Sequence, residues 1–461
     1  MLESLFHYAE NFFNNAKSFH YSEKVSTGGP CAPVQYISAK PRINEGMMKK
    51  IWLTSLALVL AAAVSAQTLD DYLRIARANS PGIRAKEVEY QAARKQLPQA
   101  RALPEPTVDA AVFIRPMMLP MGNQLGSISA MQMFPWPGTL AAREEAAAQQ
   151  AEVKREAVRV AENQLAFKVK SAWYPLLELE EQIRIQKELL RVLETDQELA
   201  VFKFGQGQAP MADAIRADIM IDETTTAIAL LELKRKPLAV AFNRLLNRDD
   251  DTPVPITEAL PEALAYQAIT ADSLIARHPE LRVFDQQIQA AAAEQAAAEF
   301  LRKPMIGAGL QYMPLVRRRT ADIHEIPPNT GRDMLMPMFT VTLPVWKKKN
   351  DAAVEERRLM QTAYADMKLE KQNELAANYA LAAYELESNA RRAELLDLQM
   401  AKTQQAIDLL LAAYRNAGQE FGEVLRLQQQ LFRYRLEKAA ALAGFQLALA
   451  QMEYWSGKSL D

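Results

Sequence analysis

The chain repeats its own pattern after about 200 residues, and this duplication constrains the fold more than any other feature. The segment 79–84 (NSPGIR) returns as 277–282 (RHPELR), and the same order of helical and alternating segments follows each copy. Solenoid units are only about 20–50 residues long, so a repeat of this length indicates a duplicated half-protein. We therefore predict two similar halves, residues 67–250 and 271–461, joined by a linker at 251–270.

Each half is expected to open with a helix. In the first half this helix is predicted over Leu69–Leu103, with Thr68 as its N-cap, because a Thr hydroxyl can accept a hydrogen bond from the first turn. In the second half it is predicted over Ser273–Lys303.

A much longer helical tract closes each half. No proline occurs after Trp346, and strong helix formers such as Ala, Glu, Leu, Gln and Lys dominate there. One helix over Lys347–Ala417 would span about 105 Å at about 1.5 Å per residue. Pro175 interrupts the matching tract of the first half, so we expect that helix to be kinked or broken there.

Between these helices, each half contains two short segments with a period of two residues. They are predicted strands at about 107–115 and 127–134, and at about 305–313 and 335–343. Val108, Ala110 and Val112, for example, alternate with small or polar residues. A half-buried sheet of a soluble protein gives the same alternation, but about eight to ten residues also suffice to span a bilayer as a tilted barrel strand.

Four strands cannot close a barrel, since membrane barrels need about eight or more. Open sheet edges are not tolerated in lipid, so an inserted chain of this kind would have to share strands between subunits. Three copies would give twelve strands. The long helices do not fit within a bilayer and would extend away from it.

An export signal is expected at residues 47–66. Two lysines precede an apolar run from Ile51 to Val64, and small residues follow, which is the pattern of a signal peptide cleaved after Ala66. A buried core helix is the alternative. Residues 1–46 are then interpreted as a miscalled N-terminal extension, and the mature chain would lack Cys31.

Composition and charge exclude several function classes. The 461 residues carry 54 basic and 56 acidic groups, which does not suit a nucleic-acid partner. Cys31 is the single cysteine, so a disulfide framework and a four-thiolate metal site are excluded. No nucleophile–base pair, phosphate loop or metal triad is present, and we expect neither enzyme activity nor a cofactor.

This order of elements resembles the TolC-type outer-membrane efflux proteins over about Thr68 to Asp461. The resemblance implies a mainly α-helical chain with a membrane β part. It further implies a homotrimer with a 12-stranded β-barrel among outer-membrane lipids and an α-helical barrel in the periplasm of a Gram-negative cell. The implied partners are a periplasmic adaptor and an inner-membrane RND-type transporter.

The turns between the long helices carry the closest similarity to that family. In the first half Phe204, Gly207 and Asp213 match the pattern of an aromatic, a glycine three residues later and an acid nine residues later. In the second half Tyr414 and Glu423 keep the nine-residue spacing, but Ala417 stands where the glycine is expected and Gly418 follows one residue later. The resemblance implies that these residues, apart from Ala417, form a tip that docks the adaptor, with Glu423 as a candidate pore constriction. Solvated charges on a helix surface are the alternative for each acid, and Arg426 weakens a purely acidic gate.

Methionines are concentrated in both predicted hairpins. Thioethers are soft ligands that suit Cu(I) or Ag(I), so Met117, Met118 and Met121 are candidate weak metal contacts, with side-chain packing as the alternative. The heavy-metal branch of the family is the nearest in appearance. We thus expect a passive exit duct of an efflux pump; the alternatives are the channel of a type I protein secretion system and a periplasmic coiled-coil scaffold.

Overall fold

The computed structural model describes residues 68–256, 258–262, 277–317, 329–417 and 421–457, which belong to a unit running from Ala66 to Asp461. The predicted extension, the predicted signal peptide, much of the predicted linker and Gly418 lie outside the described residues.

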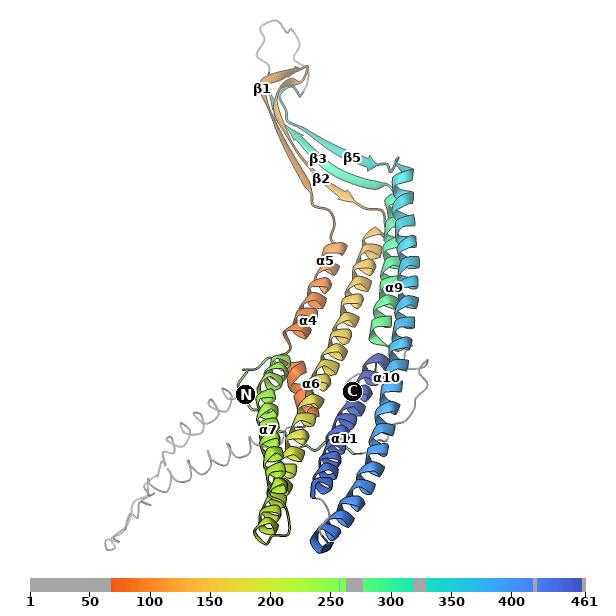
Figure 1. The fold of residues 1–461 in the computed structure, drawn as a ribbon. Helices are drawn as coiled ribbons and strands as arrows, with labels where there is room; N and C mark the ends of the chain where they lie inside the picture. The colour runs from red at the N-terminus through yellow and green to blue at the C-terminus, as the bar shows by residue number, and fades with distance from the viewer. Residues whose placement is uncertain (1–67, 257, 263–276, 318–328, 418–420, 458–461) are drawn as a thin grey trace, which may run out of the picture. The chain divides into compact units, whose positions relative to one another are not determined.

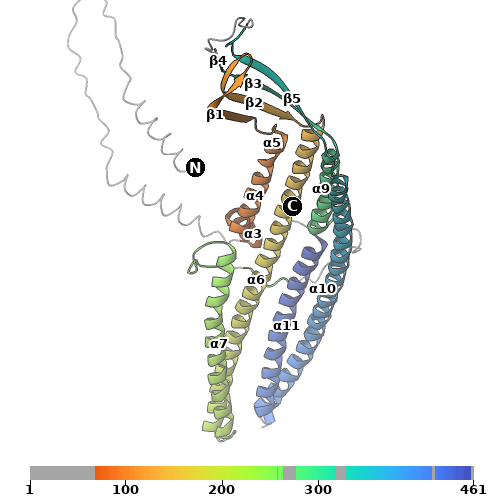
Figure 2. The same ribbon diagram turned by 90° about the horizontal axis from the view of Figure 1, so that it is seen from above.

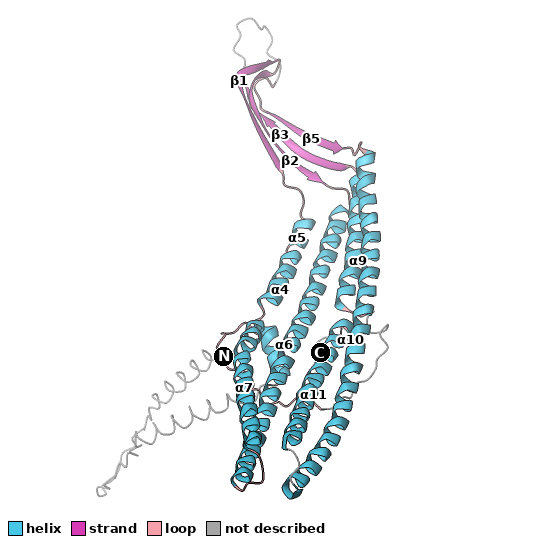
Figure 3. Cartoon of the chain, viewed as in Figure 1, coloured by secondary structure: helices cyan, strands magenta, loops and turns pink. Residues whose placement is uncertain are grey.

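Within this unit, long helices adjoin a small antiparallel sheet at one of their ends (Figures 1 and 3). In chain order the elements are α3 (Leu69–Asn79), α4 (Pro81–Arg94), α5 (Gln96–Arg101), β1 (Thr107–Leu119), β2 (Gly122–Phe134), α6 (Thr139–Gly205), α7 (Met211–Leu245), α9 (Pro279–Glu299), the 3-10 helix η1 (Phe300–Arg302), β3 (Met305–Met313), β4 (Leu315–Val316), β5 (Met334–Thr342), α10 (Lys347–Ala417) and α11 (Phe421–Ser456).

The sheet joins the strands of both halves. Its order is β1-β2-β3-β5, and all neighbouring strands are antiparallel. The two-residue strand β4 pairs with Asn123 and Gln124 at the start of β2. The β2–β3 pair, in which Phe134 lies opposite Ile306, connects one half to the other. Strands β1 and β5 are consequently the two edges.

The first hairpin is longer than the sequence pattern indicates. Strands β1 and β2 each have 13 residues and are connected through Pro120 and Met121, whereas β3 and β5 have nine each. The predicted end of the first strand lay just before Pro116, which has no N–H to donate. The register shifts between Val112 and Met117, and pairing resumes beyond the proline.

The helix predicted over Leu69–Leu103 is wrong as one continuous element. Thr68 does cap α3 in a capping box with Asp71, but α3 ends at Asn79. Ser80 then caps α4, its hydroxyl accepting a hydrogen bond from the Ile83 N–H at 3.3 Å, and Pro81 occupies the first turn. A proline here costs nothing in a new first turn but would break a continuing helix. In the second half, α9 likewise begins at Pro279.

Pro175 does not break α6, which is continuous over 67 residues. The proline removes one backbone hydrogen bond and costs about 3 kcal/mol. Its neighbours Trp173, Leu176 and Leu177 are almost fully buried, and burying each such side chain contributes about 1.5–3 kcal/mol. The helix therefore persists through the proline because tertiary packing outweighs the local penalty.

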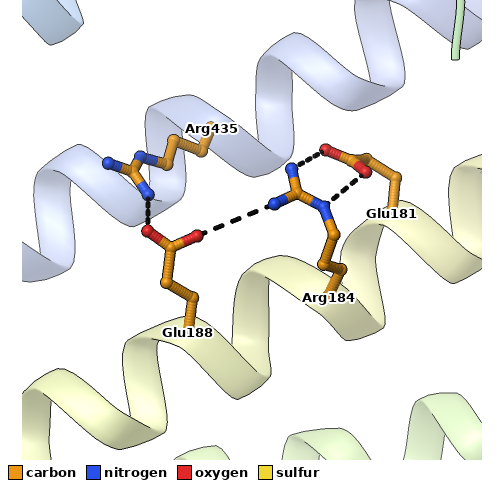
Figure 4. Close-up of polar contacts among 4 residues, drawn as sticks. All are labelled: Glu181, Arg184, Glu188 and Arg435. Atoms are coloured by element: carbon orange, nitrogen blue, oxygen red, sulfur yellow. Dashed lines mark hydrogen bonds and ion pairs between the residues drawn. The ribbon is translucent and has the colours of Figure 1, made fainter. Parts of the chain in front are cut away.

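The long helices pair within each half. Helix α6 packs along α7, α10 packs along α11, and α9 contacts both α6 and α10 (Figures 1 and 2). Helix α11 also packs on α6. There, Arg435 of α11 binds Glu188 of α6 at 2.5 Å, and Glu188 lies 3.8 Å from Arg184, which pairs with Glu181 (Figure 4). These side chains are partly exposed, so the ion pairs orient the helices more than they stabilise them.

The core of the described residues consists of two main apolar clusters and a small third one formed by Ala393, Ala441 and Leu442. The larger main cluster centres on Tyr72, Trp173 and Phe242, whose rings lie 5.0–5.5 Å apart and connect α3, α6 and α7. The other main cluster includes Leu281 and Leu375, which join α9 to α10. In both main clusters the short opening helix of the half is packed against a long one, which fixes the strands relative to the helices.

Candidate functional site

One face of the sheet is apolar and exposed. A row of residues in register, Ala110, Ile128, Tyr312 and Leu335, crosses all four long strands on this face. Phe339, on the same face of β5, is 80% exposed. A contiguous exposed apolar surface on a folded sheet marks contact with another protein or with a membrane.

The opposite face has a different chemistry. Its rows combine small, polar and thioether side chains, such as Asp109, Ser129, Gln311 and Met336 in register across the four strands. The sheet is thus two-sided, with an apolar face and a face of mixed polarity. Transmembrane β-barrels show this alternation, with the apolar face toward lipid.

The sheet has two open edges. The outer side of β1 and the outer side of β5 make no ladder with another strand among the described residues. Each edge is a row of unpaired backbone donors and acceptors, which favours pairing with a further strand.

At the far end of α6, a tight turn leads into α7. The Gly207 N–H donates to the Phe204 carbonyl at 2.9 Å and the Gln208 N–H donates to the Lys203 carbonyl at 2.9 Å, which closes the helix. Gly207 has φ 72°, in the left-handed region that glycine adopts without a Cβ penalty. A side chain at Gly207 would meet no atom within 4 Å, so the requirement for glycine is conformational.

The two first-half residues predicted beside Gly207 have different surroundings. Phe204 is 47% exposed, so its ring is available at the surface of the tip. Asp213 is only 5% exposed and lies 3.5 Å from Arg216 in the first turn of α7. An acid at this position also suits the positive end of the α7 dipole.

Tyr414, near the end of α10, contacts the end of α6. Its ring stacks on Phe421 at 4.9 Å, and its carbonyl oxygen accepts a hydrogen bond from Lys203 Nζ at 2.5 Å. The Lys203 ammonium also lies 3.9 Å from the centroid of the Tyr414 ring. Burial raises the pKa of the Tyr414 phenol. The end of α6 and the end of α10 are therefore joined by a buried cation.

Lys203 and Asp196 were missed by the sequence analysis. Both are buried on the inner side of α6, and burial raises the pKa of the Asp196 carboxyl, while a hydrogen bond from Gln428 opposes this shift. In the sequence they look like any other charges of a long polar helix. Only their position opposite α10 and α11 distinguishes them.

Glu423 forms an ion pair on its own helix. Arg426 donates from Nη2 at 2.8 Å and from Nε at 3.1 Å, and both side chains are about half exposed. The residue lies in the first turn of α11, two positions after Phe421. Its carboxylate charge is thus offset by a neighbouring guanidinium within the chain.

Met117 and Met118 belong to β1, which extends beyond the predicted strand end at about residue 115; Met121 lies between β1 and β2. Their exposed fractions are 52%, 70% and 37%. Met117 is opposite Gln124, and Met118 is opposite Asn123, so amides are their cross-strand neighbours.

The described part of the chain lacks two further features. No group of three or more His, Cys, Asp or Glu side chains there is arranged to hold a metal ion. None of its helices is both long and apolar enough to span a bilayer.

Comparison with known families identifies residues 72–248 as matching the outer membrane efflux protein family. This stretch runs from α3 to the end of α7 and so includes the first hairpin and the first turn. None of the curated proteins compared with the chain matches it by sequence.

Solved outer-membrane channels share the fold. CusC superposes with a TM-score of 0.69 at 16% identity, covering 84% of this chain and 92% of CusC. VceC from Vibrio cholerae gives 0.67 at 12% identity over 85% and 97% of the two chains. The MtrE outer-membrane channel of Neisseria gonorrhoeae gives 0.63 at 17% identity over 84% and 88%. At these identities the likeness concerns the fold.

Proposed function

We propose that this chain, a TolC-type outer-membrane efflux protein by its family match and its fold, assembles as a homotrimer with a 12-stranded barrel and serves as the exit duct of a tripartite efflux pump. Each subunit contributes the sheet β1-β2-β3-β5 to the barrel. The long helices continue it as a tube through the periplasm.

The observation that carries this proposal is a sheet with one exposed apolar face and two unpaired edge strands, β1 and β5. An open edge in lipid leaves backbone groups unsatisfied at several kcal/mol each, so the sheet can enter a bilayer only if both edges are paired. Pairing β5 of one subunit with β1 of the next closes the barrel and keeps one apolar face outward. A periplasmic scaffold without a membrane part would leave that face in water.

The turns at the opposite ends of the long helices are proposed to dock a periplasmic adaptor, which would connect the duct to an inner-membrane RND-type transporter. Phe204 and Gly207 present an exposed ring and a shaped backbone there. Asp213 and Tyr414 stabilise the helix ends at this tip through their contacts with Arg216 and Lys203. Glu423 contributes an ion pair with Arg426 to the surface of the tip. Gly418 is included by its place in the repeat.

We propose heavy-metal cations such as copper or silver as cargo. The support is chemical, since methionine thioethers favour soft cations and are abundant on the sheet. The mature protein is proposed to follow a signal peptide at residues 47–66 and to reside in the outer membrane.

The membrane placement is tested by a pair of neighbouring substitutions. Ala110 lies on the apolar face and Ala111 on the opposite face of the same strand. Ala110→Arg should reduce the yield of outer-membrane trimer, because arginine at the bilayer midplane costs about 2–4 kcal/mol. Ala111→Arg should leave it nearly unchanged. Yield is measured by membrane fractionation and by light scattering of the detergent-solubilised protein.

Equal yields of the two variants would show that the faces are misassigned. A wild-type chain that stays monomeric and soluble without detergent would refute the proposal as a whole.

A further inference from the structure

Methionine is concentrated on the mixed face of the sheet. The residues on this face include Met131 and Met133 of β2, Met305 and Met313 of β3, and Met334, Met336 and Met338 of β5. Their common orientation follows from the register, in which they pair with one another or with glycine, glutamine and threonine of the adjacent strand. None of the candidate metal contacts predicted from the sequence is in this group.

Two thioether sulfurs of this group converge above Gly307. A Cβ placed on Gly307 would lie 2.6 Å from the sulfur of Met133 and 3.4 Å from the sulfur of Met131. The Thr340 hydroxyl, from the strand on the other side, donates a hydrogen bond to the Met131 sulfur at 3.4 Å. The two sulfurs therefore share the space that any other residue at position 307 would fill.

A third thioether flanks the same region. Gly309 lies directly between Met131 and Met338 in the register, so no side chain separates these two methionines across the sheet. Met131, Met133 and Met338 are all half-buried, which leaves the group reachable from solvent. Methionine commonly fills irregular gaps in a core, but this face is not a core.

We propose that Met131 and Met133, with Met338 in reach, form a binding site for a soft monovalent cation, Cu(I) or Ag(I). Thioether sulfur selects such ions over Mg²⁺ or Ca²⁺, which require oxygen ligands. Gly307 provides the room for the ion and for both sulfurs. The site lies within one chain; only its position inside the barrel rests on the proposed function.

A site of this kind suits a duct wall. Conduction requires binding that is favourable enough for entry and weak enough for release. Neutral thioethers offer no net charge to retain a cation, so an ion held by two of them can move on. Repetition by the trimer would place three equivalent sites around the barrel.

The test uses silver, added alone to the purified trimer in detergent; the mature chain after residue 66 contains no cysteine, so no thiol can bind the ion. Wild type should retain silver in equilibrium dialysis. Loss of outer-shell partners already weakens metal sites by about 10–100-fold, so Met131→Leu with Met133→Leu should weaken binding by at least about 100-fold. Met211→Leu with Met367→Leu, which changes two exposed methionines on helices α7 and α10, is the matched control and should bind as wild type does.

Gly307→Ala supplies an independent variant that keeps both sulfurs but displaces them, and it should also weaken silver binding. The proposed site is overturned if the Met131/Met133 variant binds silver as well as wild type does, or if wild type retains no silver. Either result leaves the channel proposal intact, because trimer formation is measured separately on the same samples.

Should the double variant fail to assemble, the wild type alone decides. Bound silver should protect Met131 and Met133 from peroxide oxidation more than the exposed Met367 of α10, as measured by mass spectrometry of peptides. Equal protection of all three overturns the proposal.

Discussion

The two halves of the chain share one plan but differ in what covers their long helices. Helix α6 is enclosed by its own chain, since α3, α4, α5, α7, α9 and α11 all pack on it. Helix α10 packs on α9 and α11, and it leaves large apolar side chains in solvent, among them Leu398 at 63% and Leu409 at 73% exposed.

This difference shows how one duplicated sequence can serve two roles. The first half holds the subunit together, because its long helix is at the centre of the larger core. The second half carries an uncovered apolar stripe, which is the surface that a neighbouring subunit would need. Substitutions in the core around α6 and on the exposed surface of α10 can therefore separate folding from assembly.

The largest effect is expected in the core around α6. Trp173 of α6 is 1% exposed, whereas Tyr384 of α10 is 68% exposed. Trp173→Ala should lower the free energy of unfolding by about 3–5 kcal/mol. Tyr384→Ala should change the stability of the subunit by less than about 1 kcal/mol. Denaturant unfolding of both variants measures this, and similar losses would contradict the comparison.

Assembly should respond to the stripe on α10. Leu409→Asp places a charge where we expect a subunit contact, and it should reduce the trimer fraction without loss of helical circular dichroism. Glu387→Gln, whose partner Arg391 is on the same exposed helix surface, is the control and should assemble normally. A trimeric Leu409→Asp protein would remove the stripe from the proposed interface.

The sequence predicted the periodic parts of this fold well. The duplicated order, the strand pairs and the uninterrupted α10 follow from patterns that the backbone enforces locally. Sequence reasoning failed where distant contacts decide the outcome. The break expected at Pro175 is absent because the core around it keeps α6 continuous, and pairing resumes beyond Pro116 because a register shift accommodates the proline.

The tip was only half predictable for the same reason. The turn chemistry of Gly207 is local, and its positive φ fits the expectation of a glycine-dependent turn. The contact between the Lys203 ammonium and Tyr414 joins residues that are 211 positions apart. Local sequence patterns do not predict a contact over such a separation. The sulfurs above Gly307 likewise depend on the pairing of β2 with β3.

A smaller effect is expected at the first-half turn. Gly205 and Gly207 both have free space around a potential Cβ, but only Gly207 has a positive φ. Gly207→Ala should therefore destabilise the turn by about 1–2 kcal/mol. Gly205→Ala should be neutral or stabilising by about 0.5–1 kcal/mol, because alanine favours the helix. Hydrogen exchange of the turn amides distinguishes the two, and equal protection would show that the conformation is not constrained.

The smallest effect concerns a cap that differs between the halves. His278 caps α9 through Nδ1, which accepts a hydrogen bond from the Glu280 N–H at 3.2 Å, while Ser80 caps α4 at the matching place. Burial lowers the pKa of His278 below its ordinary 6.5; the carboxylate of Glu280 opposes that shift and Lys371 adds to it.

As the pH falls below about 6.5, the unfolded chain binds a proton at His278 more readily than the folded chain does. The stability contributed by neutral His278 is therefore complete above that pH and is lost below it. His278→Ser should remove this part of the acid sensitivity, as measured by melting temperatures between pH 5 and pH 8. An unchanged profile in the variant would assign the acid sensitivity to other groups.

The continuity of α10 also limits how the length of the paired helices α10 and α11 can change. A helix turns by about 100° per residue, so one inserted residue would rotate every later side chain away from its partner on α11. Insertions of about 7 or 11 residues restore the orientation, because they complete nearly whole turns. The antiparallel partner would need the same insertion at the facing position. The length of this helical pair is therefore quantised, and it can grow or shrink only in paired steps of about 10–17 Å.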